Sequence, residues 1–244
     1  MCGRFTLRTP MTVLIEQFQL GLEAARQLAL FEPRYNIAPT QDILTVRVDS
    51  KSGEREAALL RWGLIPSWTK EPQAGPPLIN ARGETLAEKP SFRTAVRRRR
   101  CLIAADGFYE WQKSAASTKK QPYYIHYGDN RPFAFAGLWD SWSARGATAK
   151  AAPAADALAI ESCTIVTTLA SKALASVHDR MPVILEPADY ELWLDPAVQD
   201  PAAIGHLIAP NDNEAILAEP VSTHVNRVAN DDPQCIQVQR ALFD

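Results

Sequence analysis

The sequence predicts an α+β fold: a single compact domain over residues 1–244, with a barrel-like β core rich in antiparallel strands and helices at its periphery. The 244 residues suffice to bury a core, and 46% of them are hydrophobic and 22% charged, as in globular proteins. The strand-like segments follow one another without regular helices between them, which favours this class over a doubly wound sheet. The chain carries no internal repeat.

The first segments of this fold are a helical stretch and a hairpin. Apolar residues recur near helical spacing over residues 11–30, and Thr9 or Thr12 is available as the N-cap, so one or two helices are expected there. Residues 43–48 alternate between the two faces of a strand. A short polar turn then leads to a second strand through residues 60–62, which predicts a hairpin.

The rest of the chain is expected to alternate short strands with a few helices. Strands are expected at residues 101–105, 108–112, 122–127, 133–139, 160–167, 181–185 and 221–225. Helices are expected at residues 91–98, 170–177 and 188–194. The Ala-rich stretch 144–157 has little periodicity, which is typical of a surface insertion between two strands.

The charge balance limits the partners that the whole surface can attract. Lys and Arg number 26 and Asp and Glu 28, a formal net charge of −2, so no global basic field draws the protein onto nucleic acid. An anionic partner must therefore be held by a local patch. One arginine cluster is either such a patch or a solvated helix face; it consists of Arg93, Arg97, Arg98, Arg99 and Arg100.

Two absences in the sequence bear on the compartment. No stretch reaches the roughly 18 apolar residues of a membrane span, and the N-terminus lacks the apolar core of a secretory signal. We therefore expect no membrane association and a cytoplasmic protein. The cysteines at 2, 101, 163 and 235 should then stay reduced, and their wide spacing is not that of a zinc site. Neither a disulfide framework nor a bound metal is expected.

Cys2 is the most informative single position. Initiator Met is removed efficiently when the next side chain is small, which would leave a chain that starts with an α-amine beside a thiol. With pKa values of roughly 7.7–8.0 and roughly 8.5, both groups are partly nucleophilic near neutrality. The thiol could attack an acyl carbon with the amine as base, or the amine could condense with an aldehyde and the thiol close a thiazolidine. The alternative is an ordinary chain terminus.

Two further segments carry groups suited to proton transfer. Glu110 lies among aromatic residues in Asp106–Trp111, after an apolar strand, and burial there would raise its pKa. Taken alone it could equally be an exposed strand residue. His178 lies in the polar segment His178–Pro182 and could shuttle protons at neutral pH, although a lone histidine is commonly structural.

Aromatic and basic residues suggest a way to hold nucleic acid. The segment Trp62–Trp68 opens a Pro-rich loop, and Leu78–Thr85 follows it with Arg82. Aromatic rings can stack on bases while a guanidinium holds phosphate, which is how single strands are bound. The alternative is that both tryptophans belong to the core.

Taken together, seven motifs occur in one order along the chain: Cys2–Phe5 after Met1, Arg34–Thr40, Arg61–Trp68, Asn80–Thr85, Asp106–Trp111, Phe135–Trp139 and His178–Pro182. This arrangement closely resembles the SOS-response-associated peptidase (SRAP) family, the abasic-site processing proteins. The likeness extends to the segments around Ser222 and Asn226. It implies a compact α+β domain that senses abasic sites in single-stranded DNA and protects them through a thiazolidine crosslink during the DNA damage response.

The resemblance also assigns roles to residues. It implies that Cys2 forms the covalent bond, that Asn80 positions it, and that Glu110 and His178 move protons. It further implies nucleic-acid contacts: phosphates at Arg4 and Arg82, stacking or wedging by Pro39, Trp68 and Trp111, and a weaker contact at Thr167. No cofactor is required, and a lyase activity and autoproteolytic removal of Met1 fit the same chemistry.

Two other function classes remain open. Cys2 and His178 could form an intracellular cysteine peptidase, or the protein could be a non-covalent module that binds single-stranded DNA. The tail spacing of Gln239, Leu242 and Phe243 is similar to that of peptides that bind the bacterial sliding clamp, and its alternative is a plain tail. We expect a monomer that associates with the nucleoid when bound to DNA.

Overall fold

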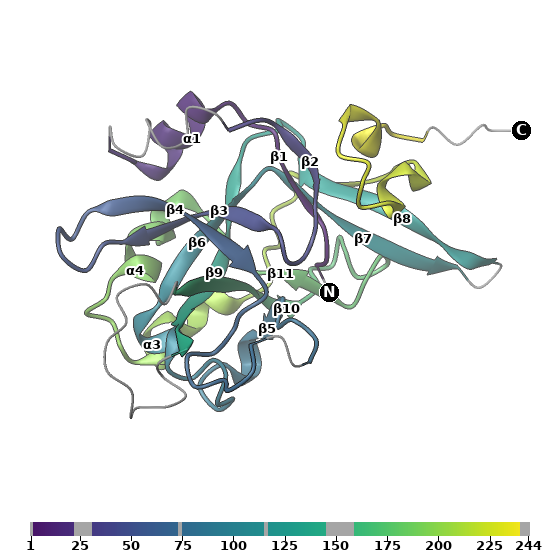
Figure 1. Cartoon of the computed structure of the whole chain (residues 1–244). Coiled ribbons are helices and arrows are strands. Elements are labelled where there is room, and N and C mark those ends of the chain that lie inside the picture. Colours follow the sequence, from purple (N-terminus) through teal and green to yellow (C-terminus); the bar gives the residue numbers. More distant parts are fainter. Residues whose placement is uncertain (1, 22–30, 73–74, 115–116, 145–158, 240–244) are drawn as a thin grey trace, which may run out of the picture.

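Five strands close into a barrel at the centre of the structure. The computed structural model describes residues 2–21, 31–72, 75–114, 117–144 and 159–239 (Figure 1). Around the barrel, neighbours pair in the order β10 (Ile160–Leu169), β4 (Arg55–Trp62), β3 (Asp42–Val48), β6 (Arg100–Ala105) and β9 (Phe133–Trp142). Pairing of β9 with β10 closes the ring, and every pair except the parallel β4–β10 is antiparallel.

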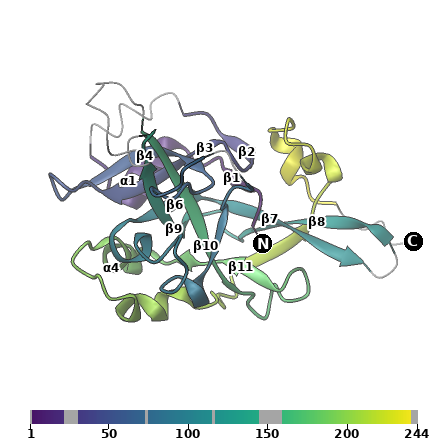
Figure 2. The same cartoon turned by 60° about the horizontal axis from the view of Figure 1, so that its bottom comes forward.

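The other strands extend this core. A second sheet has the order β13 (Ile216–Pro220), β8 (Ser117–Tyr127), β7 (Gly107–Ser114), β1 (Phe5–Leu7) and β2 (Arg34–Ile37). Short strands β5 (Asn80–Arg82) and β11 (Arg180–Pro182) pair with β10, and β12 (Ile184–Leu185) pairs with β9. The β7–β8 hairpin projects away from the barrel in both views (Figures 1 and 2).

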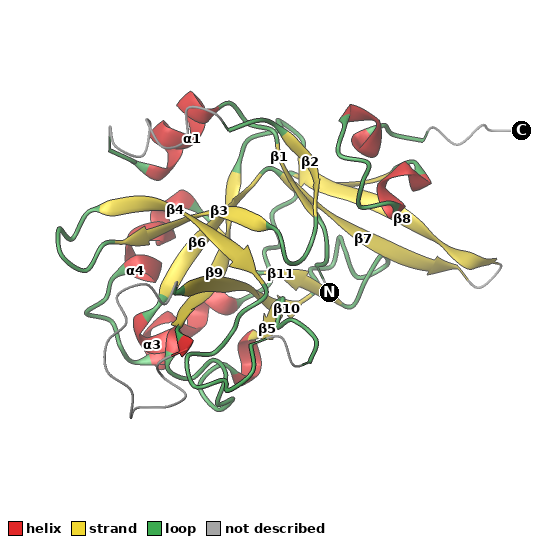
Figure 3. Cartoon of the chain, in the orientation of Figure 1, coloured by secondary structure: helices red, strands yellow, loops and turns green. Residues whose placement is uncertain are grey.

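The helices are short and lie at the periphery (Figure 3). Among the described residues, the α-helices are α1 (Met11–Phe18), α3 (Ala95–Arg98) and α4 (Tyr190–Leu194). The 3₁₀ helices are η1 (Gly83–Thr85), η3 (Pro187–Asp189), η4 (Pro201–Ile208), η5 (Thr223–Asn226) and η6 (Pro233–Ile236). In the described part of the chain, no helix has the length and apolar character needed to cross a membrane.

Aromatic side chains fill the core beneath the N-terminal strand. Phe5 makes edge-on contacts with Trp62 and Phe135, at centroid distances of 5.2 and 5.8 Å. Gly137 on β9 lets β6 pack closely, because a Cβ there would lie 2.8 Å from Cys101 Sγ. Such interdigitation fixes the start of the chain on the barrel.

The fold class is confirmed, and so is the hairpin formed by β3 and β4. The helix after residue 10 is confirmed as α1, but neither threonine caps it: the N-cap is Pro10. Thr9 Oγ1 instead donates to buried Asp106 at 2.8 Å, which also accepts from Thr6 Oγ1. The Asp106 carboxylate therefore joins β1 to the start of β7. Residues 22–30 and most of the stretch 144–157 lie outside the described residues.

Four predicted elements were wrong or incomplete. Residues 170–177 form successive turns rather than a helix, since the Ala170 N–H bonds Asp179 O at 3.0 Å and folds the segment back on itself. The strand expected at 221–225 lies at 216–220, where it pairs with β8. Ser222 Oγ then accepts from the His224 N–H and starts η5. The strand expected at 181–185 is divided into β11 and β12, and the helix expected at 91–98 covers only the four residues of α3.

Candidate active site

Four separate segments bring the predicted catalytic residues together. Cys2 precedes β1, Asn80 begins β5, Glu110 is in β7 and His178 precedes β11. The Tyr109 N–H donates to Arg4 O at 3.0 Å, which sets β7 beside the start of the chain. Asn80 Nδ2 donates to Cys2 O at 2.8 Å, and His178 Nε2 lies 3.9 Å from Glu110 Oε2.

The Cys2 side chain is fully buried. Its Sγ lies 3.7 Å from Arg4 O, to which the thiol donates. Burial, and after it the negative charge of Glu110, raises the pKa of the Cys2 thiol well above its ordinary value. The sulfur is therefore held as a thiol at neutral pH, and it becomes a strong nucleophile only when a base takes its proton.

Glu110 is only 4% exposed. Burial raises the pKa of its carboxyl, and the nearby His178 acts in the opposite direction. A carboxyl with a raised pKa keeps its proton to higher pH than an exposed glutamate does. Glu110 is thus suited to donate a proton and, once ionised, to accept one.

Neighbouring groups contact both nitrogens of the His178 ring. The Arg180 N–H donates to His178 Nδ1 at 3.0 Å. The Asp179 carboxylate also lies 2.8 Å from Nδ1, and that side chain is 86% exposed. In the neutral ring that accepts from the Arg180 N–H at Nδ1, the proton is on Nε2, which faces Glu110; in the imidazolium form both nitrogens donate, Nδ1 to Asp179 and Nε2 toward Glu110.

A hydrogen bond from Trp62 and the pairing of β5 with β10 hold Asn80 in place. Trp62 is buried, and its Nε1 donates to Ile79 O at 2.9 Å, which anchors the residue before Asn80. The parallel pairing of Asn80 with Ile165 fixes the start of β5. Asn80 Oδ1 is buried and has no hydrogen-bond partner among the described residues, so a donor can bind there.

An ion pair that was not predicted from the sequence supports this cluster. Arg180 binds both carboxylate oxygens of Glu84 at 2.9 Å, and it also donates to Thr167 O at 2.8 Å. The Arg180 hydrogen bond lowers the pKa of Glu84. Glu84 lies in the motif Asn80–Thr85 and Arg180 in the motif His178–Pro182. Their place in these two motifs was the sequence signal that could have pointed to the pair. The bidentate pair links the Asn80 segment to the His178 segment.

The residues predicted to bind nucleic acid differ in how far they are exposed. Thr167 is buried, and its Oγ1 donates to Ala81 O at 3.4 Å, so it lies beneath the surface. Arg82 is exposed and is paired in register with Thr167. Trp111 is half-buried, and its Nε1 donates to Asn226 Oδ1 at 2.8 Å. Arg4 is also half-buried and donates to Asn36 Oδ1 and Val225 O, both at 3.0 Å.

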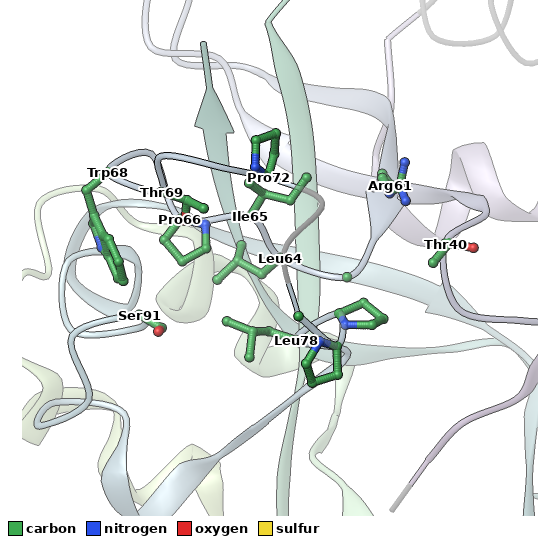
Figure 4. Close-up of a pocket in the computed structure, with 14 residues that line it drawn as sticks. Thr40, Arg61, Leu64, Ile65, Pro66, Trp68, Thr69, Pro72, Leu78 and Ser91 are labelled. Atoms are coloured by element: carbon green, nitrogen blue, oxygen red, sulfur yellow. The ribbon is translucent and has the colours of Figure 1, made fainter. Parts of the chain in front are cut away.

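The exposed tryptophan borders a separate pocket. Trp62 belongs to the core, whereas Trp68 is 62% exposed. The pocket has a volume of about 640 Å³, with Trp68 and Ser91 at one end and Thr40 and Arg61 at the other (Figure 4). Pro39 directly precedes Thr40 in the chain. Trp68 therefore lines this pocket, and Pro39 is next in sequence to one of its lining residues.

The arginine cluster separates into different environments. Arg100 is buried and donates to three backbone carbonyls, and Arg99 pairs with Asp140. Arg93, Arg97 and Arg98 are exposed. Only part of the cluster is thus a solvated surface.

One group of side chains has the composition of a metal site. The ligand atoms of His224, Asp232 and Cys235 all lie within 4.8 Å of one another. His224 Nε2 is 3.0 Å from Asp232 Oδ2, and the Cys235 thiol donates to Asn230 O at 3.3 Å. The Asp232 carboxylate also accepts from the Gln234 N–H. These bonds join η5 to η6 and give each of the three side chains a structural role.

Comparisons with known sequences cover nearly the whole chain. The family model described as SOS response associated peptidase (SRAP) matches residues 1–228. The abasic site processing protein YoqW of Bacillus subtilis is 40% identical over 237 residues, which cover 97% of this chain and 99% of YoqW. The abasic site processing protein HMCES of Pongo abelii is 32% identical over 269 residues, covering 97% and 75% of the two chains.

Solved structures share the fold. A protein from Bacteroides thetaiotaomicron superposes with a TM-score of 0.81 at 24% identity, over 98% of this chain and all of its own. A phage-related protein from Bordetella bronchiseptica gives a TM-score of 0.65 at 31% identity, over 90% and 94% of the two chains. Both support the barrel-based α+β architecture.

Proposed function

The chain belongs to the SOS response associated peptidase family, and from this premise we propose that it processes abasic sites by a covalent crosslink to single-stranded DNA. The reacting residue is Cys2, which becomes an N-terminal aminothiol after Met1 is removed. One observation carries the proposal: Asn80 holds the Cys2 backbone beside Glu110, whose carboxyl faces His178. This arrangement, with Cys2 and Glu110 buried and His178 partly exposed, supports the joint action of a nucleophile and two proton carriers.

The reaction begins at the sugar. An abasic deoxyribose is mostly a closed hemiacetal, and proton donation by Glu110 to the ring oxygen opens it to the aldehyde. The Cys2 amine then attacks the aldehyde carbon to give a carbinolamine. The imidazolium form of His178 donates its Nε2 proton to the leaving hydroxyl, one water departs, and the nitrogen returns a proton to the imidazole as the imine forms.

Ring closure completes the crosslink. The Cys2 thiol gives its proton to the Glu110 carboxylate, the sulfur bonds to the imine carbon, and the nitrogen takes up a proton. Aldehyde and aminothiol have then become a thiazolidine and one water. Where closure is slow, the imine allows elimination of the 3′ phosphate, which is a lyase reaction.

The peptidase alternative has weaker support. A cysteine–histidine pair requires the imidazole to accept the thiol proton. Here the Cys2 thiol donates to Arg4 O, and the proton-bearing nitrogen of His178 faces Glu110. Peptide-bond chemistry is therefore proposed only for the autoproteolytic removal of Met1.

The proposal extends to partners and location. The substrate is single-stranded DNA with an abasic site, bound by a monomer in the cytoplasm, at the nucleoid. The clamp-binding tail stays a prediction, since residues 240–244 lie outside the described residues and Gln239 is exposed.

A denaturing gel separates the three function classes. The protein is mixed with a labelled single strand that carries one abasic site, heated in detergent and separated. The proposal predicts a heat-stable shifted band with abasic DNA and none with undamaged DNA. Binding that is lost on denaturation would instead indicate a non-covalent module, and cleavage of peptide substrates without a shifted band would indicate a peptidase.

A further inference from the structure

Three side chains with metal-binding atoms meet where η5 and η6 lie side by side near the end of the chain (yellow in Figures 1 and 2). The ligand atoms of His224, Asp232 and Cys235 all lie within 4.8 Å of one another. The group was not predicted, because the sequence lacks the paired-cysteine spacing of common zinc sites. It shares no residue with the candidate active site, and the proposed reaction does not use it.

We propose that these three residues bind one Zn²⁺ ion, with water as the fourth ligand. An imidazole nitrogen, a carboxylate oxygen and a thiolate sulfur are all ligands that zinc takes in proteins. Around a tetrahedral zinc, with bonds of about 2.0–2.3 Å, the ligand atoms lie about 3.3–3.8 Å apart. His224 Nε2 lies 3.0 Å from Asp232 Oδ2, so small side-chain movements bring the ligands to this spacing.

The local fold presents Asp232 and Cys235 together. The Cys235 N–H donates to Asp232 O at 3.0 Å, and one turn of a 3₁₀ helix brings side chains three positions apart to the same face. Asp232 is also the N-cap of η6, where its Oδ1 accepts from the Gln234 N–H at 2.8 Å. The cap therefore orients the carboxylate and leaves Oδ2 toward His224.

The ring of His224 is oriented by a second residue. Asn230 Nδ2 lies 3.1 Å from His224 Nδ1 and donates to His224 O at 2.7 Å. When Nε2 binds zinc, the neutral ring carries its proton on Nδ1, and a half-turn of the Asn230 amide presents its oxygen to that proton. Asn230 is thus placed to hold a metal-bound imidazole in position.

Charge and access also suit a divalent cation. The Asp232 carboxylate and a Cys235 thiolate supply two negative charges, and the thiol proton passes to solvent as the metal binds. The neighbouring Asp231 is paired with Arg34 and stays outside the site. A cavity of about 330 Å³ borders the group and is lined by Ser222, Thr223, His224, Arg227 and Asn230. Water from this cavity can take the fourth position.

A metal at this site would fasten a segment that other side chains depend on. In η5, Val225 O accepts from Arg4 at 3.0 Å, and Asn226 Oδ1 accepts from Trp111 at 2.8 Å. Zinc coordination joins η5 to η6 more strongly than the hydrogen bonds that it replaces. Zn²⁺ should therefore raise the Tm of the protein.

Cobalt spectroscopy tests the site, because Co²⁺ takes the same ligands as Zn²⁺ and is coloured. One equivalent of Co²⁺ should give the visible bands of tetrahedral cobalt and the near-ultraviolet charge-transfer band of a cobalt thiolate. Zn²⁺ should then remove both. The spectra are recorded for the unmodified protein and for Cys2→Ala, which lacks the thiol of the candidate active site. Both sets of bands should persist in Cys2→Ala.

Substitutions with matched controls assign the ligands. Cys235→Ser should lose the charge-transfer band. Asp232→Asn, which can still cap η6, should weaken Co²⁺ binding by more than about tenfold, since outer-shell partners alone contribute about 10- to 100-fold. Its control is Asp200→Asn, at an exposed aspartate that caps η4 in the same way. His224→Gln is compared with His206→Gln, at an exposed histidine of η4, and only the first should weaken binding.

The zinc site would be overturned by a charge-transfer band that survives Cys235→Ser or disappears in Cys2→Ala. Equal Co²⁺ affinities for Asp232→Asn and Asp200→Asn would also overturn it, as would a Tm that Zn²⁺ leaves unchanged. The Tm of each variant without metal shows that it is folded, so that a lost affinity reports a lost ligand. Asp232 is partly exposed and keeps its capping bond as Asn, so this variant tests the site even where Cys235→Ser does not fold.

Discussion

At the residue scale, Cys2 combines two nucleophiles that no other side chain here offers together. Replacing Cys2 with Ala is expected to abolish the heat-stable adduct, because the thiazolidine needs sulfur and nitrogen from one residue. Cys2→Ser keeps the amine and is expected to give only an imine, which borohydride traps. A heat-stable adduct from Cys2→Ala on the denaturing gel would contradict ring formation at this residue.

Glu110 is expected to act in both directions of the reaction. Opening of the sugar and reopening of the thiazolidine each need a proton at nearly the same place. Glu110→Gln should therefore slow crosslinking and also slow transfer of a formed adduct to competitor abasic DNA. His178→Ala should mainly slow imine formation and elimination. Transfer at the unmodified rate by Glu110→Gln would leave Glu110 with a structural role only.

The raised pKa of Glu110 also predicts a pH-dependent stability. The folded state binds the carboxyl proton more tightly than the unfolded state, so stability is lost as pH rises from the unfolded pKa through the folded pKa. Glu110→Gln removes this loss. Its Tm should exceed that of the unmodified protein at pH 8, and the difference should shrink toward pH 4. A difference that grows as the pH falls would show that the carboxyl is stabilised as an anion.

At the scale of elements, the Glu84–Arg180 pair sets the spacing of two segments of the site. Glu84→Gln breaks the bidentate pair between η1 and β11. We expect slower crosslinking and an altered pH profile of its rate, with unchanged affinity for a single strand that carries a tetrahydrofuran abasic analogue, which has no aldehyde and cannot crosslink. The control is Glu88→Gln, an exposed glutamate of the following turn. Equal rates for the two variants would exclude a positioning role.

Elements with strong local patterns were predicted well from the sequence, and those fixed by distant partners were not. The β3–β4 hairpin follows from alternation around one turn. Strand β5 has only three residues and exists because it pairs with β10, about 80 residues later, which no local pattern reveals. The apolar spacing at 170–177 fits a helix, yet the Ala170–Asp179 bond folds the segment into turns.

The residues of the candidate site were likewise predicted only in part from the sequence. Cys2, Asn80, Glu110 and His178 came from ordered motifs, and the structure places them in contact or near one another. The tautomer of His178 could not be predicted, because it depends on a backbone N–H whose direction the fold sets. Glu84 and Arg180 looked like ordinary charged residues, since their pairing crosses 96 positions of the chain.

At the scale of the whole molecule, closure of the barrel depends on close packing between β6 and β9. Gly137→Ala would place a Cβ 2.8 Å from Cys101 Sγ and 2.9 Å from Ile103 Cδ1. Such overpacking is expected to destabilise the protein by about 1–3 kcal/mol. Gly205→Ala has open space and serves as the control in thermal unfolding. Equal Tm values for the two variants would contradict the packing account.

The arrangement of the pockets predicts a preference among DNA forms. Exposed Trp68 at one end of the pocket in Figure 4, and Pro39 beside Thr40 at the other end, would occupy the space of a pairing strand. Single-stranded and primer-junction DNA should therefore crosslink faster than an intact duplex with a central abasic site. Trp68→Ala should reduce this preference, and equal rates on all three forms would contradict a wedge at this position.

The central claim is that one residue contributes both the nitrogen and the sulfur of the crosslink. The most direct measurement is mass spectrometry of the adduct after nuclease and trypsin digestion, followed by thiol alkylation and amine labelling. The sugar remnant should be found on the peptide Cys2–Arg4, without Met1, with a mass that reflects the loss of one water, and with both thiol and amine unreactive. A remnant on another peptide, or a Cys2 thiol that is still alkylated in the heat-stable adduct, would contradict the thiazolidine.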